Sequence, residues 1–220
     1  MQNIFIGYDS REKIASDVCE HSIKKRTSEK SKINLLKLED LQKRNLYNRP
    51  TDNLSSTEFT FSRFLIPYLM NYKGWAVFCD CDFLWLGDIL KLFSLKDDNF
   101  AVMCCQHDYK PLNDLKMDGK KQLHYPRKNW SSLVLWNCSH PSNSKLDLNM
   151  VNSETGKFLH RFGWLNDNEI GSLSIEWNWL VNWYKEPKDG KPKALHFTEG
   201  GPWFSNHLNT DYADLWFEEK

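Results

Sequence analysis

The sequence predicts an α/β protein whose central sheet contains parallel strands, and three observations near its beginning indicate this class. Residues 3–7 form an apolar run that ends in glycine, which is typical of a strand stopping at a turn. Apolar residues then recur at helical spacing across 14–23, after Ser10 as a candidate helix cap. A second apolar run, 33–38, completes a strand–helix–strand unit of the kind that joins parallel strands.

The next part of the chain alternates polar segments with patterns of buried elements. Residues 40–57 are polar and rich in asparagine, so we expect a loop there. Across 59–72 the apolar side chains share one helical face, and Pro67 predicts a kink or a helix end inside it. Residues 75–79 predict a fully buried strand, and a short helix is expected at about 88–95.

Shorter patterns predict the remaining elements of a single domain covering residues 1–220. Further strands are expected at 100–105, 131–138, 176–184 and 194–197. Helices are expected at 153–162, briefly within the turn at 165–174, and in the tail at 210–220. The segments 106–130 and 185–193 are polar and predict loops. We find no internal repeat and no linker that would divide the chain.

Charge and composition count against several classes of protein. Lys+Arg and Asp+Glu both number 29, and a net charge of zero does not favour a nucleic-acid partner. The longest apolar runs are shorter than the ~20 residues of a membrane span, and no basic, apolar leader is visible. The six cysteines form no Cys-x-x-Cys pair, so we expect buried thiols in a reducing, cytoplasmic compartment. The oligomeric state stays open.

The stretch VFCDCDFLW, residues 77–85, places two carboxylates directly after a buried strand. Because side chains alternate along an extended segment, Asp80 and Asp82 point to the same side. The two carboxylates repel each other unless a divalent cation lies between them. An Asp-x-Asp triplet also occurs often by chance, and a zinc site at Cys79 and Cys81 lacks a second cysteine pair. The position beyond a strand's carboxyl end favours a ligand site.

A second candidate segment is LHFTEGGPW, residues 195–203. His196 lies among apolar residues and has two open interpretations: a core histidine with a satisfied hydrogen bond, or a neutral imidazole serving as third metal ligand. Two carboxylates, an imidazole and phosphate oxygens would suit Mn²⁺ somewhat better than Mg²⁺. Gly200 and Gly201 would let backbone N–H groups approach an anion closely.

Six segments in order resemble the glycogenin-like and lipopolysaccharide galactosyltransferase-like glycosyltransferases of family 8. They are IFIGYDS, FSRFLIPYL, AVFCDCDFLWLGDI, WSSLVLWN, NDNEIG and LHFTEGGPWF, and the resemblance extends over residues 3–204. It implies a GT-A fold, in which a Rossmann-like nucleotide half (1–105) and an acceptor half (106–204) share one mixed sheet flanked by helices, followed by a C-terminal helix (205–220). It also implies Mn²⁺ or Mg²⁺, a UDP-sugar donor, a carbohydrate or lipid-linked glycan acceptor, and retention of anomeric configuration.

The resemblance further implies roles for individual residues. Asp80, Asp82 and His196 become the metal ligands, with Asp80 also a candidate ribose contact. The expected cofactor-binding residues are Gly7, Tyr8, Asp9, Arg63, Asp80, Cys81, Gly200 and Gly201. The first three would contact base and ribose, and Arg63 would reach the donor sugar or phosphate. Asp167, Asn168 and Glu169 become the catalytic turn that holds donor hydroxyls beside the anomeric carbon, and Glu169 is also a candidate for a covalent intermediate.

Two departures from the family pattern affect these expectations. Trp130 stands where relatives carry an asparagine that contacts the donor. No lysine precedes Pro202, so a cation for the departing diphosphate is missing, and Lys193 or Arg63 are the candidates to replace it. Trp130, Trp203 and Phe204 could stack on a sugar ring or pack in the core.

Two other functions stay open on the sequence alone. A nucleotidyltransferase could use an acidic metal site, but such enzymes commonly carry a glycine-rich basic loop after the first strand, and here that loop has one glycine. A non-catalytic glycan-binding module would explain the ten tryptophans, but it would not need two aspartates and a distant histidine together.

Overall fold

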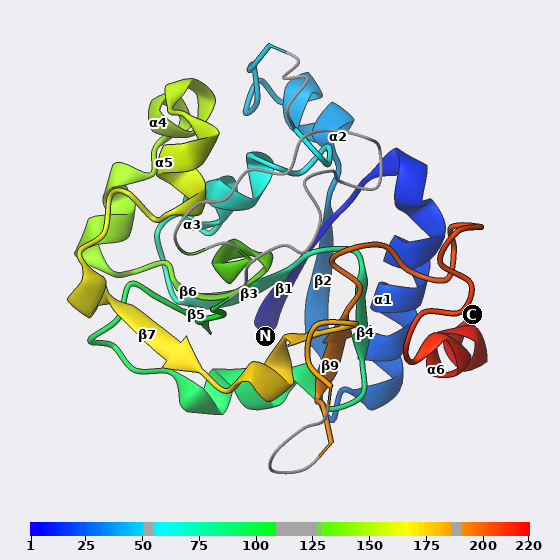
Figure 1. Cartoon of the computed structure of the whole chain (residues 1–220). Coiled ribbons are helices and arrows are strands. Elements are labelled where there is room, and N and C mark those ends of the chain that lie inside the picture. The colour runs from blue at the N-terminus through cyan, green and yellow to red at the C-terminus, as the bar shows by residue number, and fades with distance from the viewer. Residues whose placement is uncertain (51–54, 109–126, 128, 186–190) are drawn as a thin grey trace.

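A six-stranded mixed sheet forms the centre of the molecule in the computed structural model, which describes residues 1–50, 55–108, 127, 129–185 and 191–220 (Figure 1). Its strands are β1 (Gln2–Gly7), β2 (Ser31–Leu36), β3 (Trp75–Cys79), β5 (Val102–Cys105), β6 (Leu133–Asn137) and β7 (Ile170–Leu173). They lie in the order β2-β1-β3-β6-β5-β7. The α/β class and the mixed sheet flanked by helices are thereby confirmed.

Strand direction places four strand ends at one edge of this sheet. β1 pairs in parallel with β2 and β3, β6 runs antiparallel to β3 and β5, and β5 pairs in parallel with β7. β1, β3, β5 and β7 therefore all end at the same edge, at Gly7, Cys79, Cys105 and Leu173, which we call the carboxyl edge. The acidic stretch after β3 begins there, where α/β folds commonly bind ligands.

A second, three-stranded sheet lies beside the central one. Its strands are β4 (Phe83–Trp85), β8 (Trp179–Leu180) and β9 (Ala194–His196), in the order β4-β9-β8. β9 runs antiparallel to β4 and parallel to β8. This small sheet was not expected from the sequence, and it adds to the predicted central sheet.

Helices cover the sheets from several sides. The α-helices are α1 (Lys13–Arg26), α2 (Leu38–Lys43), α3 (Ile66–Leu69), α4 (Leu148–Ser153), α5 (Gly156–His160) and α6 (Ala213–Glu219). The 3-10 helices are η1 (Ser10–Glu12), η2 (Ser62–Leu65), η3 (Ile89–Leu95), η4 (Trp130–Ser132), η5 (Pro141–Lys145), η6 (Asp167–Glu169) and η7 (Ile175–Trp177).

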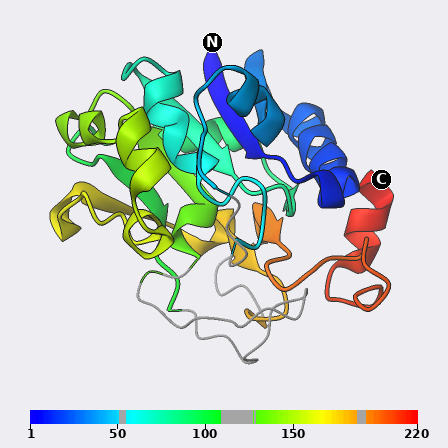
Figure 2. The same cartoon turned by 90° about the horizontal axis from the view of Figure 1, so that it is seen from above.

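The helices fall into two groups on opposite sides of the molecule. α1 packs against β4 and lies beside α6, far from α4 and α5 (Figures 1 and 2). Glu219 at the end of α6 is buried and pairs with Lys25 at 3.1 Å and Arg26 at 2.5 Å on α1. These ion pairs attach the C-terminal helix to the first helix.

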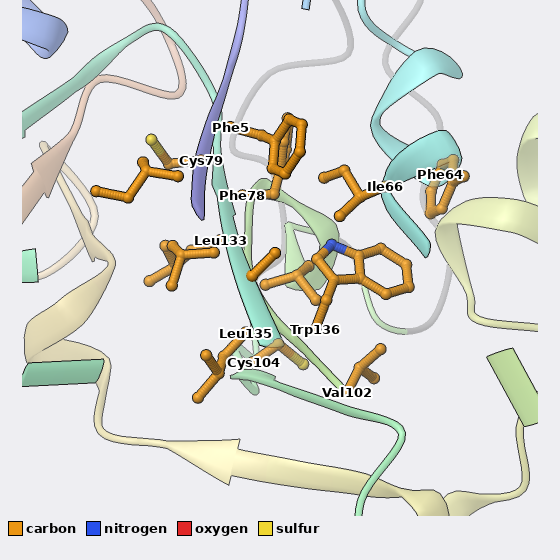
Figure 3. Close-up of a cluster of buried hydrophobic side chains, with 14 of the residues drawn as sticks. Phe5, Phe64, Ile66, Phe78, Cys79, Val102, Cys104, Leu133, Leu135 and Trp136 are labelled. Carbon is orange, nitrogen blue, oxygen red and sulfur yellow. The ribbon is translucent and has the colours of Figure 1, made fainter. Parts of the chain in front are cut away.

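The core is built on both faces of β3 and β6, whose residues are almost all buried. Trp136 lies on one face, next to Phe64 and Ile66, while Leu133 and Leu135 point to the other (Figure 3). The Trp136 ring stacks on Trp164 at 6.3 Å and meets the edge of Phe64 at 6.5 Å. Burial on both faces explains why these strands read as continuous apolar runs rather than as alternating patterns.

Most predicted strands are confirmed with small shifts of their ends, but two predictions were wrong. Residues 165–174 were expected to form a turn with a short helix, and the structure adds strand β7 after that turn. Residues 176–184 were expected to form a long strand, yet only Trp179–Leu180 is strand. Alternating tryptophans indicated burial there, and the flanking residues are buried in 3-10 and turn structure instead.

Helix predictions were less accurate than strand predictions. The face at 59–72 divides into η2 and α3, with Pro67 in the first turn of α3, where proline is tolerated. Helix α2 begins at Leu38 and extends to Lys43, into the segment 40–57, which was predicted to be loop. Asp9, rather than Ser10, caps the first helical turn, because its side chain accepts from the Arg11 backbone N–H.

The cysteines and the helices bear on two expectations from composition. All six cysteines are free and buried, as the sequence predicted. Within the described parts of the chain, no helix has the length and apolar character needed to cross a membrane.

Candidate active site

The two sheets meet where the acidic stretch joins them. Asp80 follows β3 and Asp82 precedes β4, whose first residue, Phe83, pairs with His196 on β9. Strand pairing therefore brings His196 next to the acidic stretch, although more than a hundred residues separate them in sequence. One ligand atom from each of Asp80, Asp82 and His196 lies within 4.8 Å of the others, so the predicted trio is brought together.

The side chains of Asp80 and Asp82 point to the same side of the chain, and the side chain of Cys81 points to the other. The side chains of Asp80 and Asp82 are 14% and 17% exposed, whereas Cys81 is 1% exposed. Burial, then the charge of Asp82, raises the pKa of the Cys81 thiol well above its ordinary value. Cys81 therefore packs in the core as a neutral thiol, and its expected cofactor contact can involve only its main chain.

Asp80 is held by a buried arginine. Arg63 on η2 donates from Nη1 to Asp80 Oδ1 at 2.6 Å and to the Ser131 carbonyl at 3.0 Å. Its guanidinium lies 5.0 Å from the Phe59 ring centre and 5.1 Å from that of Phe78, which fixes it in place. Arg63 was expected to reach the donor, but at 5% exposure it acts on Asp80 instead.

The pKa of Asp80 is raised to about 7, mainly because burial disfavours its charged form. The neighbouring Asp82 carboxylate acts in the same direction, while Arg63 and His196 oppose it. Asp80 thus exchanges its proton near neutral pH, and a cation that binds there must compete with that proton.

A chain of hydrogen bonds fixes the tautomer of His196. The Ser132 hydroxyl donates to the Asn129 carbonyl at 2.7 Å, so it accepts from the Asn178 side-chain N–H₂ at 2.9 Å. The Asn178 oxygen is then oriented as an acceptor, 2.8 Å from His196 Nδ1. The proton of the neutral ring must lie on Nδ1, which leaves the lone pair on Nε2.

The lone pair of His196 faces a carboxylate. Nε2 lies 3.3 Å from Asp82 Oδ2, and the imidazole ring stacks on Phe83 at 4.5 Å. The other oxygen of Asp82, Oδ1, is buried, and it has no hydrogen-bond partner among the residues described. In the neutral ring this contact joins two electron-rich atoms, which a proton or a divalent cation between them would stabilise, and a bound cation would also take up the unpaired Asp82 oxygen. The donor set therefore fits a divalent metal.

Disrupting the hydrogen bonds behind His196 tests this orientation. We expect Asn178→Leu to weaken Mn²⁺ binding by about 10–100-fold, the usual effect of removing a group that orients a metal ligand. Ser132→Ala, which removes only the next link, should weaken it less. Isothermal titration calorimetry with MnCl₂ measures both, and wild-type affinity in a folded Asn178→Leu protein would contradict this role.

The residues expected to contact the base and ribose lie at the end of β1, on the carboxyl edge. Asp9 is fully buried, and its carboxylate already accepts from Arg11 and from the Glu58 backbone N–H. Burial acts to raise the pKa of Asp9, but these hydrogen bonds hold it below its ordinary value. A Cβ on Gly7 would lie 2.3 Å from the Phe59 ring, so this glycine makes room for packing. Tyr8, half-buried, remains the predicted base contact of the three.

The glycine pair after β9 also has a packing role. A Cβ on Gly201 would lie 1.9 Å from the Trp203 ring, which occupies the space on that side. Gly200 adopts a φ of +117°, a backbone conformation that favours glycine. Trp203 packs against Phe197 and Trp216, so it is a core contact rather than an open stacking surface. The anion contact predicted for the glycines stays a prediction.

Glu12 is a buried carboxylate near the site that the sequence did not reveal. It is 8% exposed and its Oε2 accepts from the Trp203 indole N–H at 3.1 Å. Burial, followed by the charges of Asp82 and Asp9, raises the pKa of Glu12 to about 7. In the sequence it resembled an ordinary acidic residue in the first turn of a surface helix, so no pattern could identify it.

Strand register places Glu169, the last residue of the predicted catalytic turn, away from the metal trio. β7 pairs at Ile170 with Val102, which pairs with Trp136, which pairs with Ala76 at the start of β3. Glu169 directly precedes β7 and its carbonyl accepts from the Ala101 backbone N–H, so it lies at the edge opposite the carboxyl edge. At about 3.3 Å per residue, the five residues from Trp75 to Asp80 separate these edges by about 16 Å.

Local contacts of the turn agree with that position. Glu169 accepts from the Ser142 hydroxyl and from Asn166, closing a capping box on η6. Asp167 is 91% exposed at its side chain and pairs with Arg127, whose guanidinium lies 5.7 Å from the centre of the Trp130 ring, so its donor contact stays a prediction. The resemblance failed for Glu169 because β7 follows it at once, which places it at the wrong end of the strand for catalysis. Glu169 cannot supply a covalent intermediate.

Both candidate replacements for the missing lysine are already engaged. Lys193 pairs with Glu176 at 2.9 Å and lies 4.9 Å from the centre of the Trp177 ring. Arg63 pairs with Asp80, as described above. Trp130, the other departure, donates its indole N–H to the His107 carbonyl at 3.0 Å, so it offers no free polar group to a donor.

Comparison with known proteins places the chain in a family. No protein-family model matches the sequence. It is 53% identical over 220 residues to Protein CDI from Arabidopsis thaliana, and the match covers 98% of this chain and 85% of that protein. The chain belongs to the Protein CDI family.

Solved structures similar to this Protein CDI family member are glycosyltransferases. The apo form of GlyE from Streptococcus pneumoniae TIGR4 is 16% identical with a TM-score of 0.66, and the match covers 99% of this chain and 59% of GlyE. The galactosyltransferase LgtC, in complex with donor and acceptor sugar analogues, is 10% identical with a TM-score of 0.63, covering 99% and 95%. This chain thus spans less than two thirds of GlyE but nearly all of LgtC. The shared architecture is the GT-A fold.

Proposed function

We propose that this chain is a metal-dependent glycosyltransferase of the family 8 type, which moves a sugar from a UDP-sugar to a carbohydrate or lipid-linked glycan. The observation that carries the proposal is the convergence of Asp80, Asp82 and His196, with the His196 lone pair fixed toward the two carboxylates. The GT-A fold and the six ordered segments support the same activity.

A divalent cation held by these three residues, Mn²⁺ or Mg²⁺, would stabilise the negative charge that develops on the departing diphosphate. Arg63 and Lys193, the two cations considered for that point, are both paired with carboxylates. The role of Arg63 is to hold Asp80 in position and to favour its ionised form. The role of Asn178 is to orient the His196 ring by accepting from its Nδ1–H, so that Nε2 faces Asp82.

The proposed transfer proceeds with retention, on one face of the sugar. The bond between the anomeric carbon and the diphosphate oxygen breaks, and a bond to the acceptor oxygen forms from the same side. The acceptor's proton passes to an oxygen of the departing diphosphate. Glu169 lies at the opposite edge of the sheet, which removes the enzyme carboxylate that had been considered for a two-step route. We place the activity in the cytoplasm, which the six free, buried thiols support.

The proposal is tested by measuring release of UDP from UDP-glucose and UDP-galactose, with MnCl₂ or with EDTA. We expect slow, metal-dependent UDP release by hydrolysis, accelerated when a suitable glycan acceptor is present. Pyrophosphate release from a nucleoside triphosphate and a sugar phosphate would identify a nucleotidyltransferase instead. Glycan binding that persists in EDTA, with no UDP release, would identify a binding module.

Metal affinity should rise with pH. Because the pKa of Asp80 is about 7, Mn²⁺ must displace a proton from it at pH 5.5 but not at pH 8. We expect the affinity for Mn²⁺ to increase about thirty-fold over this range, at up to tenfold per pH unit below the pKa. Calorimetry in two buffers of different ionisation enthalpy measures the affinity and the proton release together. A pH-independent affinity would contradict it.

The raised pKa values of Glu12 and Asp80 make the metal-free protein less stable as pH rises, whereas metal affinity increases. A carboxyl whose pKa is raised on folding contributes stability that is complete below its unfolded pKa and is lost as pH rises through about 7. Glu12 and Asp80 both behave this way. Added Mn²⁺ should therefore raise the melting temperature more at pH 8 than at pH 5.5.

A further inference from the structure

Buried polar atoms without hydrogen-bond partners gather around the candidate metal site. Among the residues described, four of these atoms belong to residues at or beside the carboxyl edge: Arg63 Nε, Asp82 Oδ1, His107 Nε2 and Asn129 Nδ2. Such atoms cost about 1–3 kcal/mol each unless a ligand satisfies them. The roles proposed above account for Arg63 and Asp82, and they leave His107 unexplained.

His107 lies on the carboxyl edge, on the side of β6 away from Asp80. Cys104 pairs with Val134 on β6, and Asp80 donates its backbone N–H to the Ser132 carbonyl on the other side of the same strand. The chain turns after β5, where the His107 N–H donates to the Cys105 carbonyl, and the contact of the His107 carbonyl with Trp130 of η4 places His107 beside the start of β6. With strands about 4.8 Å apart, two strand spacings put it about 10 Å from Asp80, across the edge of the sheet.

The imidazole of His107 is held in a fixed orientation. Its Nδ1 lies 2.9 Å from the Tyr184 hydroxyl, and its main-chain carbonyl accepts from the Trp130 indole. The Tyr184 ring in turn packs 4.9 Å from Trp179 of β8, the strand that pairs with β9. The residue is 5% exposed. Its Nε2 atom, on the other side of the ring from Tyr184, is thus positioned with nothing in the described chain to bind.

The ring acts as a neutral hydrogen-bonding group. Burial, and second the nearby His196, lower the pKa of His107 to about 3. At neutral pH it carries no charge and has no capacity to serve as a general base. A neutral imidazole beside the Tyr184 ring suits a hydroxyl group of a sugar rather than a phosphate, which would be drawn to the metal ligands.

We propose that His107 Nε2 hydrogen-bonds a hydroxyl group of the sugar carried by the nucleotide, and that this contact selects the donor sugar. The inference rests on the proposed function and deepens it. It assigns the discrimination between donors to a residue outside the metal trio. It also explains how the site can select a donor when Trp130 replaces an amide and has its own N–H occupied.

The test compares two substitutions that each keep one ring nitrogen's position. His107→Asn retains an atom near Nδ1 for Tyr184 but removes Nε2, and His107→Gln retains an atom near Nε2. We expect His107→Asn to weaken Mn²⁺-dependent binding of the UDP-sugar that the wild type prefers, UDP-glucose or UDP-galactose. The expected loss is about tenfold in affinity, which corresponds to the loss of one hydrogen bond. Binding of UDP itself should stay within about twofold. His107→Gln should retain most of the affinity.

Deoxygenated donors identify the hydroxyl. Wild-type protein should lose about tenfold in affinity for one monodeoxy UDP-sugar, and His107→Asn should show no further loss with that analogue. If His107→Asn does not fold, Tyr184→Phe is the second variant, and it should weaken UDP-sugar binding while leaving UDP binding unchanged. Calorimetry gives both affinities, and thermal melting confirms folding.

Three results would overturn the inference. His107→Asn could weaken UDP and UDP-sugar binding equally, or its loss of affinity could add to the loss caused by every deoxy analogue. The wild type could also bind the UDP-sugar no more tightly than UDP. Failure of the proposed function is distinct, because it would appear as no Mn²⁺-dependent binding of UDP by the wild-type protein. Loss confined to the acceptor's KM would place the contact on the acceptor and likewise overturn the donor assignment.

Discussion

Asp82→Asn should abolish metal-dependent sugar transfer while making the metal-free protein more stable. The substitution removes one metal ligand and the negative charge that attracts the cation, so we expect UDP release with Mn²⁺ to fall by about 10³-fold. The new amide can donate to His196 Nε2, 3.3 Å from the present Oδ2, and it no longer repels Asp80 and Glu12. Loss of that repulsion should stabilise the metal-free fold by about 1 kcal/mol.

Two measurements separate these effects. The melting temperature in EDTA should rise by a few degrees, since about 1 kcal/mol shifts it by ~2–4 °C in a chain of this size. The further rise that Mn²⁺ gives the wild type should disappear. Asp98→Asn, an exposed substitution before β5, is the matched control and should leave both measurements unchanged. A lower melting temperature in EDTA for Asp82→Asn would show that Asp82 has a structural role instead.

Arg63→Met should be the most destabilising single substitution near the site. Methionine is of similar length and can lie between the Phe59 and Phe78 rings, so the packing is largely kept. Asp80 is left as a buried carboxylate without its cationic partner, and breaking such a pair costs about 3–5 kcal/mol. The expected fall in melting temperature is on the order of 10 °C, measured by calorimetry without metal.

The pH dependence of this loss identifies its cause. Without Arg63 the pKa of Asp80 should move further above about 7, so the destabilisation should be larger at pH 8 than at pH 6. The double substitution Arg63→Met/Asp80→Asn should recover part of the lost stability, because no charge then remains unpaired. Equal losses at both pH values and strictly additive single effects would mean that Arg63 contributes through packing alone.

The sequence predicted the central strands well because their physical signal is local. β3, β5 and β6 are buried on both faces, and a short apolar run between polar segments is enough to identify such a strand. The small sheet could not be found in this way. β8 is two residues long, and its existence depends on pairing with β9, a tertiary contact that leaves no periodicity in the sequence.

In the candidate site, too, residues with a local sequence signal were predicted, and residues defined by tertiary contacts were not. Asp80 and Asp82 were identified by alternation along an extended segment, and His196 by its unusual place in an apolar strand. Glu169 was misassigned because a motif was carried over without the register of β7, which decides the edge at which this residue lies. Glu12 and His107 were missed because each is notable only for its burial, and the adjacent sequence does not indicate that either is buried.

The pairing of Phe83 with His196 has a mechanical consequence. Asp80 belongs to the central sheet and His196 to the small one, so an ion bound by both would couple the local opening of two separate hydrogen-bonded units. Amide hydrogen exchange should then slow in β9 when Mn²⁺ is added and stay unchanged in β2, at the far side of the central sheet. Metal binding would thus stiffen the small sheet before any sugar is transferred.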